Sequence, residues 1–385
     1  MIQLADVFKI AVLPGDGIGR EVIPQAVRVL EAIEDEMNGF ELETHLFHCG
    51  GEYYTKHGRE WSEETESFSK TEADAVLLGA VGAVDSNGQE IRLPDNNLAG
   101  YNIVIGLRME LDLYANVRPV KLLPGVPIPI KKEPESIDMV MIRENTEGLY
   151  APIRGKLSRG TIIDLATDVR VITRFASERI ARYAFEKASS RKGAPKDGVK
   201  RVTCVDKSNL LAGCQLFRQV FTEVSQDYEN IHTDFAYVDS FVQWLVRRPE
   251  HYDVIVAPNE FGDIITDLGA ALQGGLGMAP AGNIGRNKAV FEPVHGSAPA
   301  HYGKSSANPI AAILSGAMML EWLGEKNENK SCLIASKTVY EAVEEVLREG
   351  EIRTSDLCWG EWADVTPSST DEMTDEIISQ IKEIT

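Results

Sequence analysis

The stretch FKIAVLPGDGIGRE, residues 8–21, decides the fold class. Its apolar run ends at a proline and several glycines, and a segment with apolar residues at helical spacing follows directly, at 21–37. This order predicts a buried strand, a tight turn and an amphipathic helix. The glycines do not have the GxGxxG spacing of a dinucleotide fingerprint, and the Lys-Ser/Thr of a phosphate-binding loop is missing. We therefore expect a strand-to-helix turn and a cofactor site that is not of the Rossmann type.

The same alternation of strand and helix continues along the chain. We expect further strands at 74–82, 137–143, 199–205 and 252–257, and helices at 176–189, 212–227, 308–323, 335–348 and 371–383. Such an order predicts an α/β fold with much parallel sheet. The proline-rich stretch 122–136 is expected to be an extended surface connection.

Composition limits the classes of function. The chain has 385 residues, 43% of them hydrophobic and 25% charged, which is long enough for two globular domains. A net charge of −20 argues against a nucleic-acid partner, because phosphate binding needs a basic surface. No stretch reads as a membrane span or a signal peptide. Five scattered cysteines without a CxxC pair predict reduced, packed thiols in a cytoplasmic protein.

Three arginines point to a site for an anionic substrate. Arg108, Arg118 and Arg143 each lie beside a strongly apolar segment. Arginine in such a setting often binds a carboxylate or phosphate through two parallel hydrogen bonds, although a single one is more often a surface residue. Together with DKSN (206–209) at an expected strand end, they suggest a site for a substrate with several carboxylates.

Two aspartates raise the question of a bound cation. Asp263 and Asp267 lie four positions apart in NEFGDIITD (259–267), where a helix is expected to begin. Like charges at this spacing destabilise a helix unless a positive group lies between them. Mg²⁺ commonly takes one or two carboxylates with water and substrate oxygens. A cation is one interpretation, and a preference of Asp263 for the positive end of the helix dipole is the other.

Several long motifs resemble the isocitrate/isopropylmalate dehydrogenase family. They are RENTEGLY (143–150), NEFGDIITD (259–267), GGLGMAPAGNIG (274–285) and FEPVHGSAP…ANPIAAILSGAMML (291–320), and the resemblance extends in order over nearly the whole chain. It implies a metal-dependent, β-decarboxylating dehydrogenase with an isopropylmalate dehydrogenase-like α/β fold. It also implies a cofactor-side domain at 1–113 plus 274–385 and a substrate and dimerisation domain at 114–273.

The resemblance implies a role for each matching residue. Tyr150 and Lys207 match the catalytic pair, Arg108, Arg118 and Arg143 the arginines that bind the malate carboxylates, and Asp239, Asp263 and Asp267 the ligands of Mg²⁺ or Mn²⁺. Lys207 and Asp239 would act in the site of the partner subunit of a homodimer, and a higher oligomer stays open. Without the resemblance, Tyr150 and Lys207 would be taken for ordinary core and surface residues.

NAD is the expected cofactor. The resemblance places Ile18, Asn209, His295, Gly296, Ala298, Ala300, His301 and Asn308 around it. After HGSAP, NAD-dependent members usually have Asp-Ile and bacterial NADP-dependent isocitrate enzymes have Lys-Tyr, whereas this chain has Ala300-His301. NAD is favoured because only His301 offers a positive group to the 2′-phosphate of NADP, and NADP stays open.

The expected specificity residues favour an apolar substituent on the substrate. The resemblance places Asn102, Val104, Ile105 and the partner subunit's Leu210 there. An unpaired carboxylate beside them would be costly, whereas burying an isopropyl group is favourable by about 0.8 kcal/mol per CH₂. The best match is 3-isopropylmalate, which would yield 4-methyl-2-oxopentanoate and CO₂, a reaction of leucine biosynthesis.

Other substrates, and a function without catalysis, remain alternatives. Tyr101 stands where many isopropylmalate enzymes have Glu, and PVKLLPGVP and KSN look more like the tartrate/D-malate branch. Homoisocitrate and isocitrate come after these. A non-catalytic regulatory member of the family is the alternative of a different class, and the presence of Lys207 and Tyr150 argues against it.

Overall fold

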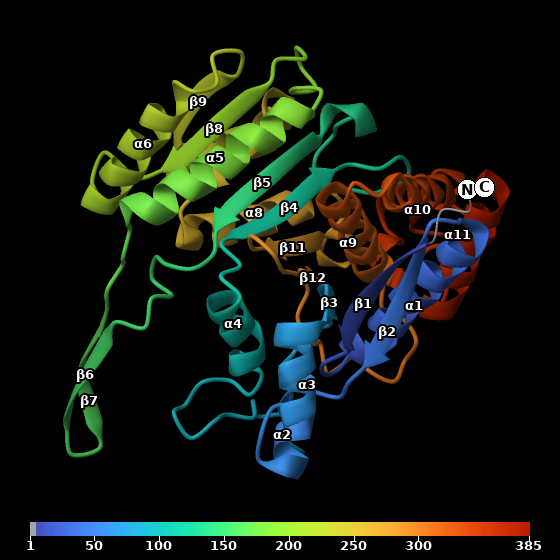
Figure 1. Ribbon diagram of the computed structural model, residues 1–385, viewed down its shortest axis with the longest axis horizontal. Coiled ribbons are helices and arrows are strands. Elements are labelled where there is room, and N and C mark those ends of the chain that lie inside the picture. The colour runs from blue at the N-terminus through green and yellow to red at the C-terminus, as the bar shows by residue number, and fades with distance from the viewer. Residues whose placement is uncertain (1–4) are drawn as a thin grey trace. The chain divides into compact units, whose positions relative to one another are not determined.

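The computed structural model describes residues 5–385 and divides the chain into two compact units. Unit 1 contains Met1–Leu113, Leu122–Pro134 and Ala270–Thr385, and unit 2 contains Tyr114–Lys121 and Glu135–Gly269. Each unit has a sheet covered by helices, which confirms the predicted α/β fold class (Figure 1).

The sheet of unit 1 has the strand order β2-β1-β3-β12-β11. Its strands are β1 (Asp6–Leu13), β2 (Phe40–Leu46), β3 (Ala75–Leu78), β11 (Pro280–Ile284) and β12 (Ala289–Pro293). Neighbours are parallel except for the antiparallel pair β11 and β12. Most residues of β1 and all of β3 are buried, which is why both read as continuous apolar runs.

Helix α9 is the centre of the core of unit 1. The helices of this unit are α1 (Gly19–Glu36), α2 (Gly51–His57), α3 (Glu63–Ser67), α4 (Tyr101–Glu110), α9 (Ile310–Asn327), α10 (Lys330–Glu349) and α11 (Thr370–Ile384). The sequence IAAILSGAMML of α9 is buried on every face, as expected of a central helix. It packs on β3, β11 and β12, and α1 and α10 pack on it.

Unit 2 repeats this architecture with the strand order β4-β5-β10-β8-β9. The strands are β4 (Ala115–Lys121), β5 (Asp138–Glu144), β8 (Arg201–Asp206), β9 (His232–Tyr237) and β10 (Val254–Ala257), and the helices are α5 (Arg174–Ser190), α6 (Ala212–Ser225), α7 (Val238–Arg247) and α8 (Asn259–Ala271). Only the pair β4 and β5 is antiparallel. Because β5 and β10 are parallel, Arg143 near the carboxyl end of β5 lies close to the start of α8.

A two-stranded arm projects from unit 2 (Figure 1). It consists of β6 (Arg154–Arg159) and β7 (Ile162–Asp168), which pair only with each other. Every residue of both strands is exposed, including Leu157, Ile162, Ile163 and Leu165. An isolated two-stranded ribbon has little stability in water, so the exposed apolar side chains require an explanation.

The prediction of a surface connection at 122–136 is wrong for its first half. Leu122, Leu123 and Val126 are buried. Gly125 has a φ of +75°, and a Cβ there would lie 2.1 Å from the carbonyl oxygen of Leu347. The apolar residues between the prolines anchor this segment in unit 1, whereas the prolines alone suggested an extended surface chain.

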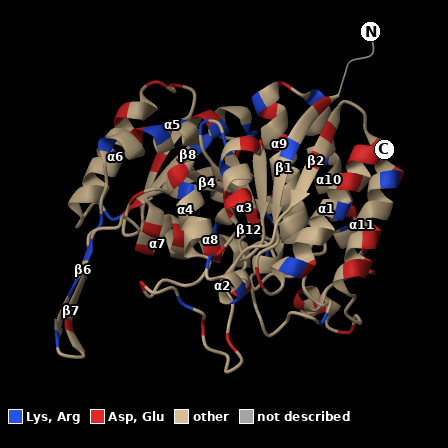
Figure 2. Cartoon of the chain, turned by 60° about the horizontal axis from the view of Figure 1, so that its bottom comes forward, with Lys and Arg blue, Asp and Glu red and all other residues tan. Residues whose placement is uncertain are grey.

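Charges and thiols follow the expectations from composition. Acidic and basic side chains are interspersed over the helices (Figure 2). All five cysteines are free thiols, and four of them are buried. Burial raises the pKa of Cys49 and of Cys332 to about 12. Within residues 5–385, no helix is both long and apolar enough to cross a membrane.

Candidate active site

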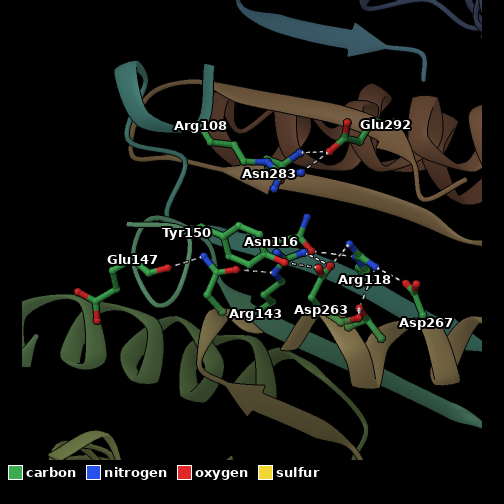
Figure 3. A network of polar contacts seen from close by, with 12 residues as sticks. Arg108, Asn116, Arg118, Arg143, Glu147, Tyr150, Asp263, Asp267, Asn283 and Glu292 are labelled. Carbon is green, nitrogen blue, oxygen red and sulfur yellow. Dashed lines mark hydrogen bonds and ion pairs between the residues drawn. The ribbon is translucent and has the colours of Figure 1, made fainter. Parts of the chain in front are cut away.

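Unit 2 brings Arg118, Arg143, Asp263 and Asp267 together in one polar network (Figure 3). The side chain of Arg143 is 4% exposed, and its guanidinium forms an ion pair with Asp263. Arg118 reaches both carboxylates, at 3.6 Å from Asp263 and 3.1 Å from Asp267. A cationic group therefore does bridge the two acids one helical turn apart, and it is a guanidinium of the chain itself.

Neutral side chains fix the orientation of both arginines. Arg118 donates from Nε to Asn116 Oδ1 at 2.9 Å and from Nη1 to Thr266 Oγ1 at 2.8 Å. Arg143 donates from Nε to Asn259 Oδ1 at 2.9 Å. These bonds hold two guanidinium groups in fixed directions, which is how arginine recognises a carboxylate.

Two glycines allow the network to be this tight. A Cβ on Gly262 would lie 2.6 Å from Cγ of Arg143, so only glycine lets α8 pass so close to that side chain. Gly148 has a φ of +85°, and a Cβ there would meet Cβ of Asn259 at 2.9 Å. The glycine in RENTEGLY thereby places the loop that carries Tyr150.

The hydroxyl of Tyr150 donates to Asp263 Oδ2 at 2.9 Å. The guanidinium of Arg143 lies 5.4 Å from the centre of the same ring. The ring is 47% exposed, so Tyr150 is not the core residue that its sequence context alone would suggest. Its hydroxyl proton is therefore directed at the carboxylate of Asp263.

Lys207 and Asp239 form a second group in unit 2. Nζ of Lys207 lies 2.5 Å from Oδ1 of Asp239, and the hydrogen bond from the ammonium lowers the pKa of Asp239. The turn that carries Lys207 is held by the buried Asp206, which accepts from the amide of Ser208 at 2.8 Å. Arg218 fixes the carboxylate of Asp206 in turn, by donating two hydrogen bonds to it at 2.7 and 2.9 Å.

The carboxylates of Asp263 and Asp267 provide some, but not all, of the ligands that a divalent cation needs. The oxygens of Asp263 and Asp267 are hard ligands suited to Mg²⁺ or Mn²⁺, and a cationic group already lies between them. Across residues 5–385, no group of three potential metal ligands forms, and Asp239 pairs with Lys207 instead. Two carboxylates per chain are compatible with a metal whose other ligands come from elsewhere.

Residues near Lys207 are notably exposed. Leu210 is 73% exposed, Leu211 is also exposed, and Asn209 lies between Lys207 and Leu210 with its side chain at the surface. An apolar side chain this open, next to a candidate catalytic lysine, is unusual for a site completed within one chain.

In unit 1, Arg108 is held at the end of α4. Its Nη2 lies 3.2 Å from Oε1 of Glu292, and the same oxygen accepts from Nδ2 of Asn283 at 2.7 Å. Nε of Arg108 is buried, and none of residues 5–385 accepts a hydrogen bond from it. A partly buried guanidinium with an unsatisfied donor is suited to binding a carboxylate.

Helix α4 presents the predicted specificity residues on two different faces. Tyr101, Val104 and Ile105 line a cavity of about 390 Å³ together with Val81 and Leu98. Asn102 lines another cavity with Gly106 and Glu110, four and eight positions further along. The structure therefore groups Val104 and Ile105 with Tyr101 and separates Asn102 from them.

A residue that the sequence did not single out holds Asn102 in place. The buried carboxylate of Glu60 accepts from the amides of Gly100 and Asn102 at 2.5 and 3.2 Å, and from Nδ2 of Asn102 at 2.6 Å. It thus caps the N-terminus of α4 from a distant part of the chain. Neither spacing nor motif marks Glu60 in the sequence, because the contact spans 40 positions.

Removing this cap is expected to destabilise the chain. Glu60→Ala leaves the buried amide of Gly100 without a partner and should lower the free energy of unfolding by about 2 kcal/mol. Glu60→Gln should lower the free energy of unfolding by less than Glu60→Ala does. The amide oxygen of the glutamine can still accept from the amide of Gly100, and the side-chain amide of Asn102 can turn to face the new NH₂ group. Urea unfolding measures both, with Asn102→Ala as the control that keeps the backbone bonds. Equal stability of all three variants would contradict the capping role.

The predicted cofactor residues of unit 1 cluster around two loops. The amide of Ile18 donates to the carbonyl of Ser297 at 2.8 Å, which joins the first turn to the HGSAP loop. Ala298 has a φ of +38°, and its carbonyl accepts from the amide of His301 at 2.9 Å. Gly296, Ala300 and His301 are exposed, as expected of residues that contact a ligand.

One ring nitrogen of His295, in the HGSAP loop, has no hydrogen-bond partner among the described residues. Its Nδ1 lies 3.0 Å from the carbonyl of Gly296, and burial lowers the pKa of the ring. Its Nε2 is buried and has no hydrogen-bond partner among residues 5–385. Asn308, also buried, donates to Asp356 Oδ2 at 3.0 Å. A neutral imidazole with a free acceptor fits a ligand that donates a hydrogen bond, as the amine of adenine does.

Comparisons with known proteins agree on one family. A family model described as isocitrate/isopropylmalate dehydrogenase matches residues 9–377. The D-malate dehydrogenase [decarboxylating] of Escherichia coli (strain K12) is 40% identical over 91% of this chain and 94% of its own. The 3-isopropylmalate/3-methylmalate dehydrogenase of Methanocaldococcus jannaschii is 40% identical over 97% and 99%.

A solved structure extends the agreement to the fold. The crystal structure of isocitrate dehydrogenase from Methylococcus capsulatus has a TM-score of 0.81 with 34% identity, and the match covers 97% of this chain and 99% of that one. The predicted isopropylmalate dehydrogenase-like fold is therefore confirmed. With a family match over nearly its whole length, this chain is an enzyme that belongs to the isocitrate/isopropylmalate dehydrogenase family.

Proposed function

We propose that this enzyme catalyses the NAD-dependent and divalent-metal-dependent oxidative decarboxylation of a 3-substituted malate, with 3-isopropylmalate as the best match. The observation that carries the proposal is the network of unit 2, where two fixed guanidinium groups, two carboxylates and a phenol meet. Guanidinium groups suit the carboxylates of a 2-hydroxy diacid, the aspartates suit a metal, and the phenol can move a proton.

The chain's own groups have distinct tasks in this reaction. Arg118 and Arg143, with Arg108 as a third cation, bind and orient the carboxylates of the substrate. The free amine of Lys207, contributed by the other subunit, would accept the proton of the substrate's 2-hydroxyl. After the β-carboxylate leaves as CO₂, Tyr150 donates a proton to carbon 3. Its hydroxyl already lies in a hydrogen bond at this network, so the proton is held in place.

The metal ion and the cofactor would each be held by a separate set of residues. Asp263, Asp267 and the partner subunit's Asp239 would hold Mg²⁺ or Mn²⁺, which would supply Lewis-acid stabilisation of negative charge on the substrate. NAD would supply the acceptor for the hydride of C2. Ile18, His295 and Asn308 would bind the cofactor in the domain predicted at 1–113 plus 274–385, with Asn209 contributed by the other subunit.

A homodimer with shared sites is part of the proposal. Lys207 and Asp239 pair with each other in one chain and do not complete a three-ligand site there, within residues 5–385. Leu210 beside them is exposed, and so is the whole β6–β7 arm with four large apolar side chains. A second copy of the chain that covers the arm and receives Lys207 would account for these features together.

The pocket on α4 supports an apolar substituent on the substrate. Val104, Ile105, Leu98 and Val81 line it, whereas the amide of Asn102 is bound to Glu60. Arg92 also lines this cavity, but it is paired with Glu90 at 2.5 Å and donates to the carbonyl of Asn96. An isopropyl group gains free energy there, and a carboxylate would have to displace an existing ion pair.

D-malate is the second candidate substrate because Tyr101 lines the same cavity. A ring that fills the space of the isopropyl group would leave room for malate itself. The comparisons also give equal identity to a D-malate enzyme and to an isopropylmalate/methylmalate enzyme.

A comparison of kcat/KM for 3-isopropylmalate, D-malate, tartrate, isocitrate and homoisocitrate tests the substrate. We expect 3-isopropylmalate to be the best, and isocitrate and homoisocitrate to be poor because each brings a further carboxylate to an apolar wall. If D-malate or tartrate is best, Tyr101→Ala should shift the preference toward 3-isopropylmalate. Preference for isocitrate or homoisocitrate would contradict the apolar pocket.

NAD is proposed over NADP because the residues at positions 300 and 301 carry little positive charge. Ala300 and His301 are exposed and offer no permanent positive charge. The nearby Arg20 lies over the ring of Tyr302 at 5.9 Å and is held by Glu52 at 2.8 Å. A 2′-phosphate beside Ala300 and His301 would therefore find weak electrostatic support from these two residues.

A further inference from the structure

Unit 1 has a second cavity that shares no residue with the proposed active site. Its volume is about 380 Å³, within the range of small-molecule sites. It lies beyond the carboxyl ends of β1 and β2, between the first turn of α1 and helix α2, with Pro14 and Gly15 in its wall. The carboxyl ends of parallel strands are the usual place for ligands in an α/β sheet.

Basic side chains dominate the polar part of its lining. Arg20, His48, Lys56 and His57 all contribute, in a chain whose net charge is −20. Arg20 is fixed, because Nε donates to the carbonyl of Gly15 at 3.2 Å and Nη1 pairs with Glu52 at 2.8 Å. Lys56 and the two histidines are exposed, so their charges are available to a ligand.

The rest of the wall is largely apolar. Pro14, Pro24 and Leu46 line the cavity, and Leu46 is 64% exposed. The rings of Tyr53 and His57 lie 4.2 Å apart with an angle of 31° between their planes, so they present an aromatic surface next to Lys56. Such a wall suits a planar organic group rather than a hydrated inorganic ion.

We propose that this cavity binds a phosphate monoester with a planar apolar body. A doubly charged phosphate has three acceptor oxygens, which can meet a guanidinium, an ammonium and imidazole donors at once. A single carboxylate has fewer acceptors and half the charge. The prolines, Leu46 and the Tyr53 ring bind the organic body.

Site-resolved protection of histidines tests the proposal, with phenyl phosphate as the probe. Carbethoxylation of His48, His57 and the exposed His232 of β9 is followed by peptide mass spectrometry on the full-length protein. At ten times the dissociation constant, modification of His48 and His57 should slow about tenfold by mass action, and His232 should not change. Because the readout is local, binding at the proposed active site does not imitate it. Equal protection of all three histidines, or of none, would overturn the proposal.

Matched variants and ligands sharpen the test. Lys56→Gln should raise the half-protecting concentration about tenfold, which corresponds to ~1.4 kcal/mol. Lys337→Gln, an exposed lysine of α10, should leave that concentration unchanged. Benzoate that protects as well as phenyl phosphate would overturn the phosphate assignment. Inorganic phosphate that protects as well would overturn the role of the apolar wall.

Discussion

Asp263→Asn is expected to lower kcat/KM about a thousandfold, a loss of ~4 kcal/mol of transition-state stabilisation. Asp267→Asn should have an effect of the same order, because both carboxylates are proposed ligands of one cation. A titration of Mn²⁺ in the presence of substrate, followed by the paramagnetic signal of the free ion, should show weaker binding in both variants. This readout does not depend on turnover.

The two variants should differ in stability, and the structure gives the reason. Asp263 is the ion-pair partner of the buried Arg143, so its loss leaves a buried charge poorly compensated and should cost about 1–3 kcal/mol. Asp267 is 60% exposed and contacts only Arg118 among the ion pairs of the described chain, so its loss should cost less than about 1 kcal/mol. Relief of the repulsion between the two acids offsets part of either loss.

Asp227→Asn serves as the control. Asp227 is an exposed residue outside α8, and its carboxylate forms a surface ion pair with Arg182. It should keep full activity and Mn²⁺ affinity. Wild-type activity that survives exhaustive chelation, or Mn²⁺ affinity that both variants retain, would contradict the metal assignment even if activity were lost.

Mixing two inactive variants is expected to restore about one quarter of the wild-type activity, provided that the enzyme is a dimer with sites shared across its two-fold axis. The variants are Lys207→Ala and Tyr150→Phe. After random exchange half of the dimers are mixed, and each mixed dimer has one site with both native residues. The proposal predicts this because Lys207 acts in the partner subunit's site while Tyr150 acts in its own.

The structure offers a matched control for this mixing. Arg143 and Tyr150 belong to one network within a single chain, with the guanidinium 5.4 Å from the ring centre. Arg143→Lys mixed with Tyr150→Phe should therefore restore nothing beyond the activity of the parents. Native mass spectrometry verifies that subunits exchange. Verified mixed dimers of Lys207→Ala and Tyr150→Phe without activity would argue that each site lies within one chain.

Long, strongly periodic elements were predictable from the sequence. The apolar run at 8–14 is β1, and the helix expected at 308–323 is α9 (Ile310–Asn327), because a buried strand and a buried helix both leave uninterrupted apolar patterns. The short strand β3 covers only part of the stretch 74–82. Gly79 lies just beyond the strand, and a Cβ there would lie 2.1 Å from the carbonyl oxygen of Pro14. The glycine serves this close approach, so the sequence overstated the length of the strand.

Elements with weak patterns were not predictable. β6 and β7 are exposed on both faces and show no alternation, and β9 alternates only partly because it is an edge strand. Helix α4 has little amphipathic character, since its two faces line two different cavities. These elements could not be predicted because their buried and exposed positions do not alternate in a regular apolar and polar pattern.

The candidate site shows the same division. The motifs carried Asp263, Tyr150 and Arg143, and the structure brings all three into contact. The supporting residues, Glu60 and Asn116, make hydrogen bonds that no motif records. The like charges of Asp263 and Asp267 raised the question of a positive group between them. Arg118 contacts both acids in this structure, so the pair alone does not establish a metal, and the metal stays a prediction.

The most direct test of the central claim is a joint measurement of reduced nicotinamide and CO₂ formed from 3-isopropylmalate with Mg²⁺. The proposal predicts one CO₂ for each reduced nicotinamide, since decarboxylation follows oxidation on the same molecule. It also predicts complete loss of both products on chelation and a higher kcat/KM with NAD than with NADP. A strong preference for NADP would reverse the cofactor assignment. Formation of neither product from any 2-hydroxy diacid of the substrate panel, by a folded dimer, would contradict the account.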